Sequence, residues 1–88
     1  METTNIEATF YLGLISFINS DYDSAESYYL QALDLDSGNN DIKNYLSKVY
    51  LEQEMADEAI SLLTEIAEDT QDKLVWMRIG KIYAEMEY

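Results

Sequence analysis

The chain has 88 residues, enough for one small domain, and it contains three glycines and no proline, which is typical of helices joined by short turns. It has no histidine and no cysteine, so the commonest catalytic bases, thiol nucleophiles, metal ligands and disulfides are excluded. Eighteen acidic and five basic residues give a net charge of -13, which argues against a polyanionic partner such as nucleic acid.

Capping signals mark the starts of the first two predicted helices. The segment Thr4-x-x-Glu7 has the form of a capping box, in which the Thr hydroxyl and the Glu carboxylate each satisfy an otherwise unpaired amide at the helix start. Ser20 or Asp21 can cap the second helix in a similar way. These two helices are expected over residues 6–19 and 21–35.

Polar turns separate the remaining helices. Ser37, Gly38 and Asn39 supply the glycine and polar residues that end a helix, and Asn39 or Asn40 can cap the third. Residues 69–72 form the turn into the last helix. The last three helices are expected over residues 40–53, 56–68 and 73 to the end.

Residue types recur along the chain at a fixed spacing. Five positions return 34 residues later with small or apolar residues, namely Leu12, Gly13, Ala25, Tyr29 and Ala32 as Leu46, Ser47, Ala59, Leu63 and Ile66. A partial third copy follows at a spacing of 33, in which Leu46, Ser47 and Tyr50 return as Ile79, Gly80 and Tyr83. Such a period indicates stacked two-helix units, none of which buries its apolar face alone. We therefore expect an all-α fold, an α-α superhelix of about five helices in antiparallel pairs.

The single expected domain spans residues 1–88, with repeat one over 6–39, repeat two over 40–72 and a partial repeat three over 73–88. Within the pairs, small residues should lie where two helices cross closely, with Gly13 facing Ala25 and Ser47 facing Ala59. Glycine within a helix costs on the order of 1 kcal/mol relative to alanine, so Gly13 and Gly80 are interpreted as sites of close packing.

The recurring residues resemble the tetratricopeptide repeat, which places Leu-Gly, small and aromatic residues at set positions. The match rests on Leu12, Gly13, Ala25, Tyr29 and Ala32 in unit one, on Leu46, Tyr50 and Ala59 in unit two, and on Trp76, Ile79, Gly80 and Tyr83 in the third. The chain departs from the pattern at Thr9, Ser16, Ser37, Lys43, Glu54 and Gln71. The resemblance implies a non-enzymatic protein-binding module whose first helices line a concave groove for a peptide or helix.

Two related interpretations of the repeat have less support. The pentatricopeptide repeat has a similar period and binds RNA, but the charge of this chain disfavours that partner. Some tetratricopeptide proteins clamp a terminal carboxylate with a Lys, Asn, Asn, Lys, Arg set. Those positions here hold Phe10, Leu14, Tyr45, Leu74 and Arg78, so only the arginine matches and a more apolar ligand is expected.

The repeat register assigns residues to the inner side of the groove. The predicted ligand contacts are Phe10, Leu14, Phe17, Tyr45, Lys48, Met77, Arg78 and Lys81. The groove is thus apolar at its amino-terminal end and basic at the other.

Basic residues are confined to the first helices of units two and three or their edges. An acidic body with a basic stripe in a concave surface would concentrate an anionic ligand near Lys48, Arg78 and Lys81. The expected partner is therefore a segment with acidic residues beside apolar anchors. The alternative is that Lys48 pairs with Glu52 and Lys81 with Glu85, four residues apart on one helix face. A basic partner for the acidic exterior is a further alternative.

The last helix carries a second functional hypothesis. Trp76, Ile79, Gly80 and Tyr83 should lie on the side that its own second helix normally covers. Either the chain is a fragment of a longer array, which we favour, or this apolar surface packs on another copy or on a partner.

No metal, cofactor or catalytic site is expected. Residues 34–40 resemble a calcium loop only faintly, because the glycine is one place early and Tyr45 replaces the bidentate glutamate. No apolar run is long enough to span a membrane, and residues 1–5 lack the features of a secretory signal. A cytoplasmic protein is the simplest expectation.

Overall fold

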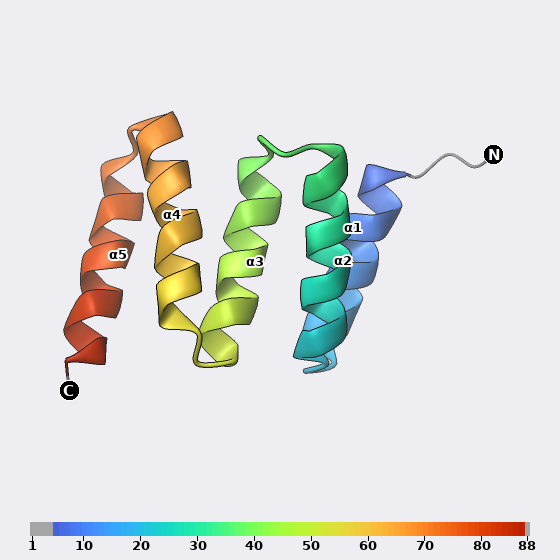
Figure 1. The fold of residues 1–88 in the computed structure, drawn as a ribbon, viewed down its shortest axis with the longest axis horizontal. Coiled ribbons are helices and arrows are strands. Elements are labelled where there is room, and N and C mark those ends of the chain that lie inside the picture. Colours follow the sequence, from blue (N-terminus) through green and yellow to red (C-terminus); the bar gives the residue numbers. More distant parts are fainter. Residues whose placement is uncertain (1–4, 88) are drawn as a thin grey trace.

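The computed structural model describes residues 5–87, and five α-helices make up this part of the chain. They are α1 (Ile6–Ile18), α2 (Tyr22–Leu35), α3 (Asn40–Glu52), α4 (Ala56–Thr70) and α5 (Lys73–Met86). Successive helices run antiparallel and form a row from α1 to α5 that is 47 Å long and 16 Å thick (Figure 1). Each helix packs on its neighbours in sequence, and α1 also touches α3. The predicted all-α helical repeat is confirmed.

The capping residues resolve the alternatives that the sequence left open. Asp21 caps α2 by accepting a hydrogen bond from the amide of Ser24 (3.3 Å), and Asn39 caps α3 through the amide of Ile42 (3.1 Å). For α1 the capping side chain is Asn5, whose Oδ1 accepts from the amide of Ala8 at 3.1 Å. The predicted capping box involves Thr4, which lies outside the described residues.

Three of the turns contain a residue with a left-handed backbone conformation. Positive φ angles occur at Ser20 (62°), Glu54 (63°) and Gln71 (58°), and the first two of these residues are 34 positions apart, at the repeat spacing. The helix α2 ends at Leu35 as predicted, and the Gly38 that follows it does not adopt a positive φ. The helix α4 continues to Thr70, two residues beyond its predicted end, because Gln71 adopts the left-handed conformation that stops it.

The core consists of two clusters, each joining the second helix of one unit to the first helix of the next. The first cluster contains Ala25, Tyr29 and Ala32 of α2 with Ile42, Leu46 and Val49 of α3. The second contains Ile60, Leu63, Ile66 and Ala67 of α4 with Val75, Ile79 and Ile82 of α5. Stacking between units therefore joins the buried apolar residues of neighbouring repeats into these two clusters.

The two helical glycines differ in their surroundings. A Cβ added at Gly13 would lie 2.6 Å from Cε1 of Tyr29, so the predicted close approach is present, with Tyr29 rather than Ala25 as the nearest side chain. A Cβ at Gly80 would meet no atom within 4 Å. The prediction of close packing at Gly80 is wrong because no helix among residues 5–87 covers that side of α5.

Within residues 5–87, no helix combines the length and the apolar character needed to cross a membrane.

Candidate functional site

The first helices of the three units, α1, α3 and α5, border two hollows. The larger, which we name the α1–α3 hollow, has a volume of about 420 Å³. The smaller, the α3–α5 hollow, has a volume of about 210 Å³. Both lie on the helices that the repeat register assigns to the concave side.

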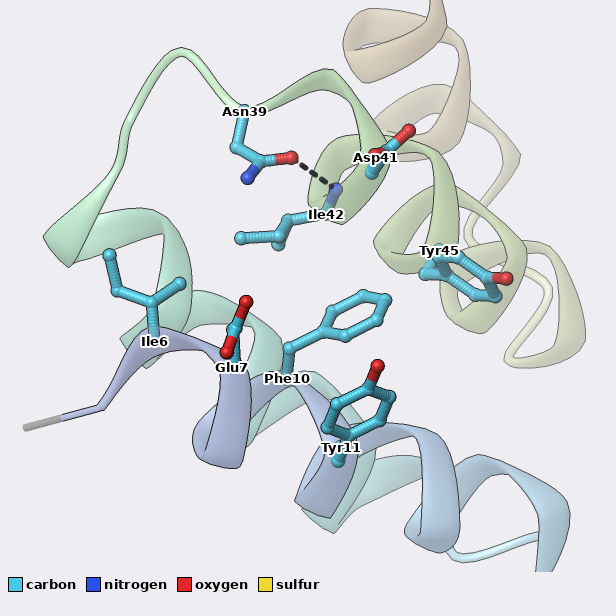
Figure 2. Close-up of a pocket in the computed structure, with 8 residues that line it drawn as sticks. All are labelled: Ile6, Glu7, Phe10, Tyr11, Asn39, Asp41, Ile42 and Tyr45. Carbon is cyan, nitrogen blue, oxygen red and sulfur yellow. Dashed lines mark hydrogen bonds between the residues drawn. The ribbon is translucent and has the colours of Figure 1, made fainter.

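The α1–α3 hollow combines aromatic and acidic side chains. Its lining residues are Ile6, Glu7, Phe10 and Tyr11 of α1, Asn39 at the cap of α3, and Asp41, Ile42 and Tyr45 of α3 (Figure 2). The Phe10 ring meets the Tyr45 ring edge to face, with 5.2 Å between centroids, and lies 5.6 Å from the Tyr11 ring. These contacts hold three rings together at one place on the surface.

The α3–α5 hollow is basic. It is lined by Leu51 of α3 and by Arg78, Lys81, Ile82 and Glu85 of α5. Nη1 of Arg78 donates a hydrogen bond to Oδ1 of Asn44 at 2.9 Å, which fixes the guanidinium against α3. Two of the three bases of the predicted stripe therefore share this hollow.

Lys48 lies on α3 between Tyr45, which lines the α1–α3 hollow, and Leu51, which lines the α3–α5 hollow. Its Nζ stands 4.9 Å from the centroid of the Tyr45 ring, within the range of a cation–π contact. Among residues 5–87, the ion pair within 4 Å joins Lys43 to Glu65 of α4 at 3.0 Å, and neither Lys48–Glu52 nor Lys81–Glu85 is formed. The side-chain pairing considered from the sequence does not hold Lys48 or Lys81 in this structure.

The other predicted groove residues lie elsewhere. Phe17 packs on Tyr22 of α2 with 5.6 Å between ring centroids and lines neither hollow. Leu14 is half-buried and also lines neither. Met77 is 67% exposed and stays outside both. The hollows lie on the helices that the register assigned to the groove, but their linings include only four of the eight predicted contacts, Phe10, Tyr45, Arg78 and Lys81.

Three residues that line the α1–α3 hollow were not predicted from the sequence, namely Glu7, Tyr11 and Asp41. Glu7 and Tyr11 return as Asp41 and Tyr45 at the repeat spacing of 34. This repeated acid-x-x-x-Tyr pattern was the available signal. Glu7 falls in the first turn of α1, where it was interpreted only as part of a capping box, and Asp41 in the first turn of α3 was assigned no role.

The outer face of α5 matches only part of the predicted surface. Trp76 is 45% exposed and Tyr83 is 52% exposed, and Gly80 lies between them. Ile79 does not belong to this surface, because it is 5% exposed and packs against α4. At the repeat spacing Gly80 matches Ser47, which is fully buried in α3.

Apolar residues are also exposed on α1, at the opposite end of the row from α5, where Leu12 and Ile15 are about half exposed. They match Leu46 and Val49, which pack α3 onto α2. This surface was not predicted from the sequence.

Among residues 5–87 no group of three or more acidic side chains is arranged to hold a metal ion. The chain has neither histidine nor cysteine.

Comparison with known proteins agrees with the repeat. The family model described as tetratricopeptide repeat matches residues 17–82, which is most of the chain and includes parts of all five helices. A comparison with curated proteins found no match. Tetratricopeptide repeats generally mediate protein–protein interaction and are typically non-catalytic. With its period, its antiparallel helix pairs and this match, the chain belongs to the tetratricopeptide repeat family, with about two and a half repeats.

Proposed function

We propose that residues 1–88 form one non-enzymatic domain that binds a segment of a partner protein along α1, α3 and α5. The observation that carries this proposal is the pair of hollows on the first helices of successive units. Phe10 and Tyr45 supply aromatic surface at one end, and Arg78 and Lys81 supply charge at the other.

The basic end supports an acidic residue in the bound segment. Arg78 and Lys81 share the α3–α5 hollow, and their positive charges stand in a protein of strongly negative net charge. Arginine held in place by Asn44 loses little conformational freedom when a carboxylate binds. The acidic composition also disfavours nucleic acid as the partner. We further propose a cytoplasmic location for the protein.

A random library of 12-residue peptides, displayed and selected on the wild-type chain, tests this proposal. Selected peptides should lose affinity for the Lys48→Glu, Arg78→Glu, Lys81→Glu variant, measured by fluorescence anisotropy. Two single substitutions control for the change in net charge. Lys81→Glu alters the α3–α5 hollow, whereas Lys73→Glu makes the same charge change outside it. The proposal is wrong if no selected peptide depends on these bases or on Phe10 and Tyr45.

A second candidate function is self-association through the outer face of α5. Trp76 and Tyr83 expose aromatic surface around the open position at Gly80, and burying such surface contributes roughly 25 cal/mol per Å². Light scattering across a dilution series should then show dimers that Trp76→Ser with Tyr83→Ser abolishes. Met77→Ser serves as the control, since Met77 is exposed on the same helix. A monomeric mass at every concentration would contradict this candidate.

A further inference from the structure

The α1–α3 hollow has the size and floor of a side-chain binding site. Its volume of about 420 Å³ falls in the range of roughly 300–1,000 Å³ usual for ligand pockets. Phe10 and Tyr45 form the floor, and Ile6 and Ile42 add aliphatic surface (Figure 2). Such a surface suits the aliphatic stem of a long side chain.

The rim of the hollow is negatively charged. Glu7 of α1 and Asp41 of α3 lie on its two sides, and its lining contains no basic residue (Figure 2). The nearest base in sequence, Lys43, is paired with Glu65 of α4. A cation entering the hollow would therefore meet two carboxylates in the lining, while the Lys48 ammonium, 4.9 Å from the Tyr45 ring centroid, stands outside the lining.

Two helix starts border the hollow but do not reverse its charge. Each helix amino terminus carries roughly half a positive elementary charge, which is smaller than one carboxylate. One amide at each helix start is already occupied, because the Asn5 side chain accepts from Ala8 and the Asn39 side chain accepts from Ile42. The hollow therefore favours a cation over an anion.

Aromatic rings beside carboxylates are suited to arginine or lysine. A guanidinium or ammonium group gains from the face of a tyrosine and from charged hydrogen bonds to carboxylates. The structure contains such a contact nearby, where Lys48 stands over the Tyr45 ring. We infer that the α1–α3 hollow is a subsite for a basic side chain of the bound protein segment, an inference that rests on the function proposed above.

This subsite makes the concave side bipolar. The bound segment carries arginine or lysine in the α1–α3 hollow and an acidic residue in the α3–α5 hollow. A segment bound in the opposite direction would place each of its charged residues in the hollow that carries the same sign of charge. The charges therefore determine the direction of the bound segment as well as its affinity. The inference adds a basic residue to the segment with acidic residues and apolar anchors that the sequence predicts.

The experiment uses the peptides selected above and two charge-matched variants. Glu7→Gln with Asp41→Asn neutralises the rim of the hollow. Asp57→Asn with Glu58→Gln removes the same charge from the first turn of α4, outside both hollows, and controls for general attraction and for helix stability. Circular dichroism before and after heating compares the folding of the two variants.

The inference predicts that selected peptides contain arginine or lysine and that the hollow variant binds them about 10-fold more weakly than wild type. The control variant should change affinity by about twofold or less. Replacing the basic residue of the peptide with glutamine should weaken wild-type binding and abolish the difference between wild type and the hollow variant.

Two other results separate the failure of the inference from that of the proposed function. If peptides depend on Lys48, Arg78 and Lys81 but need no basic residue, or lose equal affinity in both neutralised variants, the inference is overturned and the proposed function stands. If no peptide depends on either hollow, both are overturned.

Discussion

Tyr29 lies where α1, α2 and α3 meet, and it links the binding surface to the core. Its side chain is fully buried, and its ring lies 5.7 Å from Phe10 and 6.2 Å from Tyr45 by centroid distance. Gly13 leaves the space that this ring occupies. The position of the α1–α3 hollow therefore depends on a residue that the solvent does not reach.

The two helical glycines should respond in opposite directions to alanine. Gly13→Ala forces its Cβ against Tyr29 and should lower the free energy of unfolding by about 1–3 kcal/mol. Gly80→Ala meets no atom and should raise it by about 0.5–1 kcal/mol, because alanine favours the helix. Urea unfolding of both variants measures the two changes. Stabilisation by Gly13→Ala would show that the Tyr29 ring can move aside at little cost.

The Tyr29 hydroxyl should make stability fall at alkaline pH. Burial, and secondly the neighbouring Tyr45, raises the pKa of Tyr29 from 10.0 to about 12. The unfolded chain then loses this proton at a lower pH than the folded chain, so the associated stability is complete below pH 10 and is lost as the pH approaches 12. At about 1.4 kcal/mol per pKa unit, the loss amounts to about 2–3 kcal/mol. Urea unfolding at pH 8 and at pH 11.5 tests this.

Tyr29→Phe isolates that contribution. The hydroxyl has no hydrogen-bond partner among residues 5–87, so its removal should raise the free energy of unfolding by about 1 kcal/mol at pH 8. The variant should also lose less stability between pH 8 and 11.5. A smaller alkaline loss should remain, because burial and Glu26 raise the pKa of Tyr50 as well. An unchanged alkaline loss in the variant would rule out Tyr29 as its source.

At the scale of the helices, the turns carry strain that glycine would remove. Glu54 has a φ of 63° and is exposed, and a non-glycine residue in this region costs on the order of 1 kcal/mol. Glu54→Gly should therefore raise the melting temperature by about 4–8 °C. Glu52→Gly removes the same charge from the last residue of α3 and should destabilise the protein, since glycine weakens a helix. Equal effects of the two changes on thermal unfolding would attribute them to charge alone.

The helices were predictable from the sequence because spacing and capping residues act locally. The five elements and the period of 34 follow from apolar spacing, and Asp21 and Asn39 were already among the candidate caps. The surroundings of Gly80 were not predictable, because the repeat pattern marks a helix face without telling whether another helix covers it. Ile79 was misassigned for the same reason.

The candidate site was only partly predictable. Phe10 and Tyr45 follow from the repeat register, since they project from equivalent helices. The acidic rim was not predicted because Glu7 and Asp41 lie in the first turns of their helices. Acidic residues are favourable there in any helix, so their presence does not by itself indicate a binding site. Only the distance between α1 and α3 shows that the two acids border one hollow.

At the scale of the whole molecule, the five helices form a row with two core clusters rather than a single centre. Each cluster lies between neighbouring units, and α1 and α5 expose apolar residues at the two ends. The binding surface runs along this row, so its shape depends on how the units stack. Few contacts join helices that are not neighbours in the row. Long-range electrostatics is therefore the main interaction that acts across the whole molecule.

The net charge of -13 should make stability rise with salt. The row is 47 Å long and 28 Å wide. At about 0.01 M salt the screening length is about 30 Å, so acidic groups repel across the full width, whereas at about 0.1 M it is about 10 Å and only near neighbours interact. The melting temperature should therefore rise over this range, by about 4–8 °C for each 1 kcal/mol of repulsion removed.

A variant with fewer acids tests whether repulsion is the cause. Asp57→Asn, Glu58→Gln and Glu68→Gln neutralise three exposed carboxylates outside both hollows. This variant should melt higher than wild type at low salt and gain less from added sodium chloride. A wild-type melting temperature that falls with salt would instead mean that attractions such as Lys43–Glu65 outweigh the repulsion. In that case the acidic surface would contribute to the fold, and the charges around the two hollows would have to be interpreted first as part of the protein's own stability.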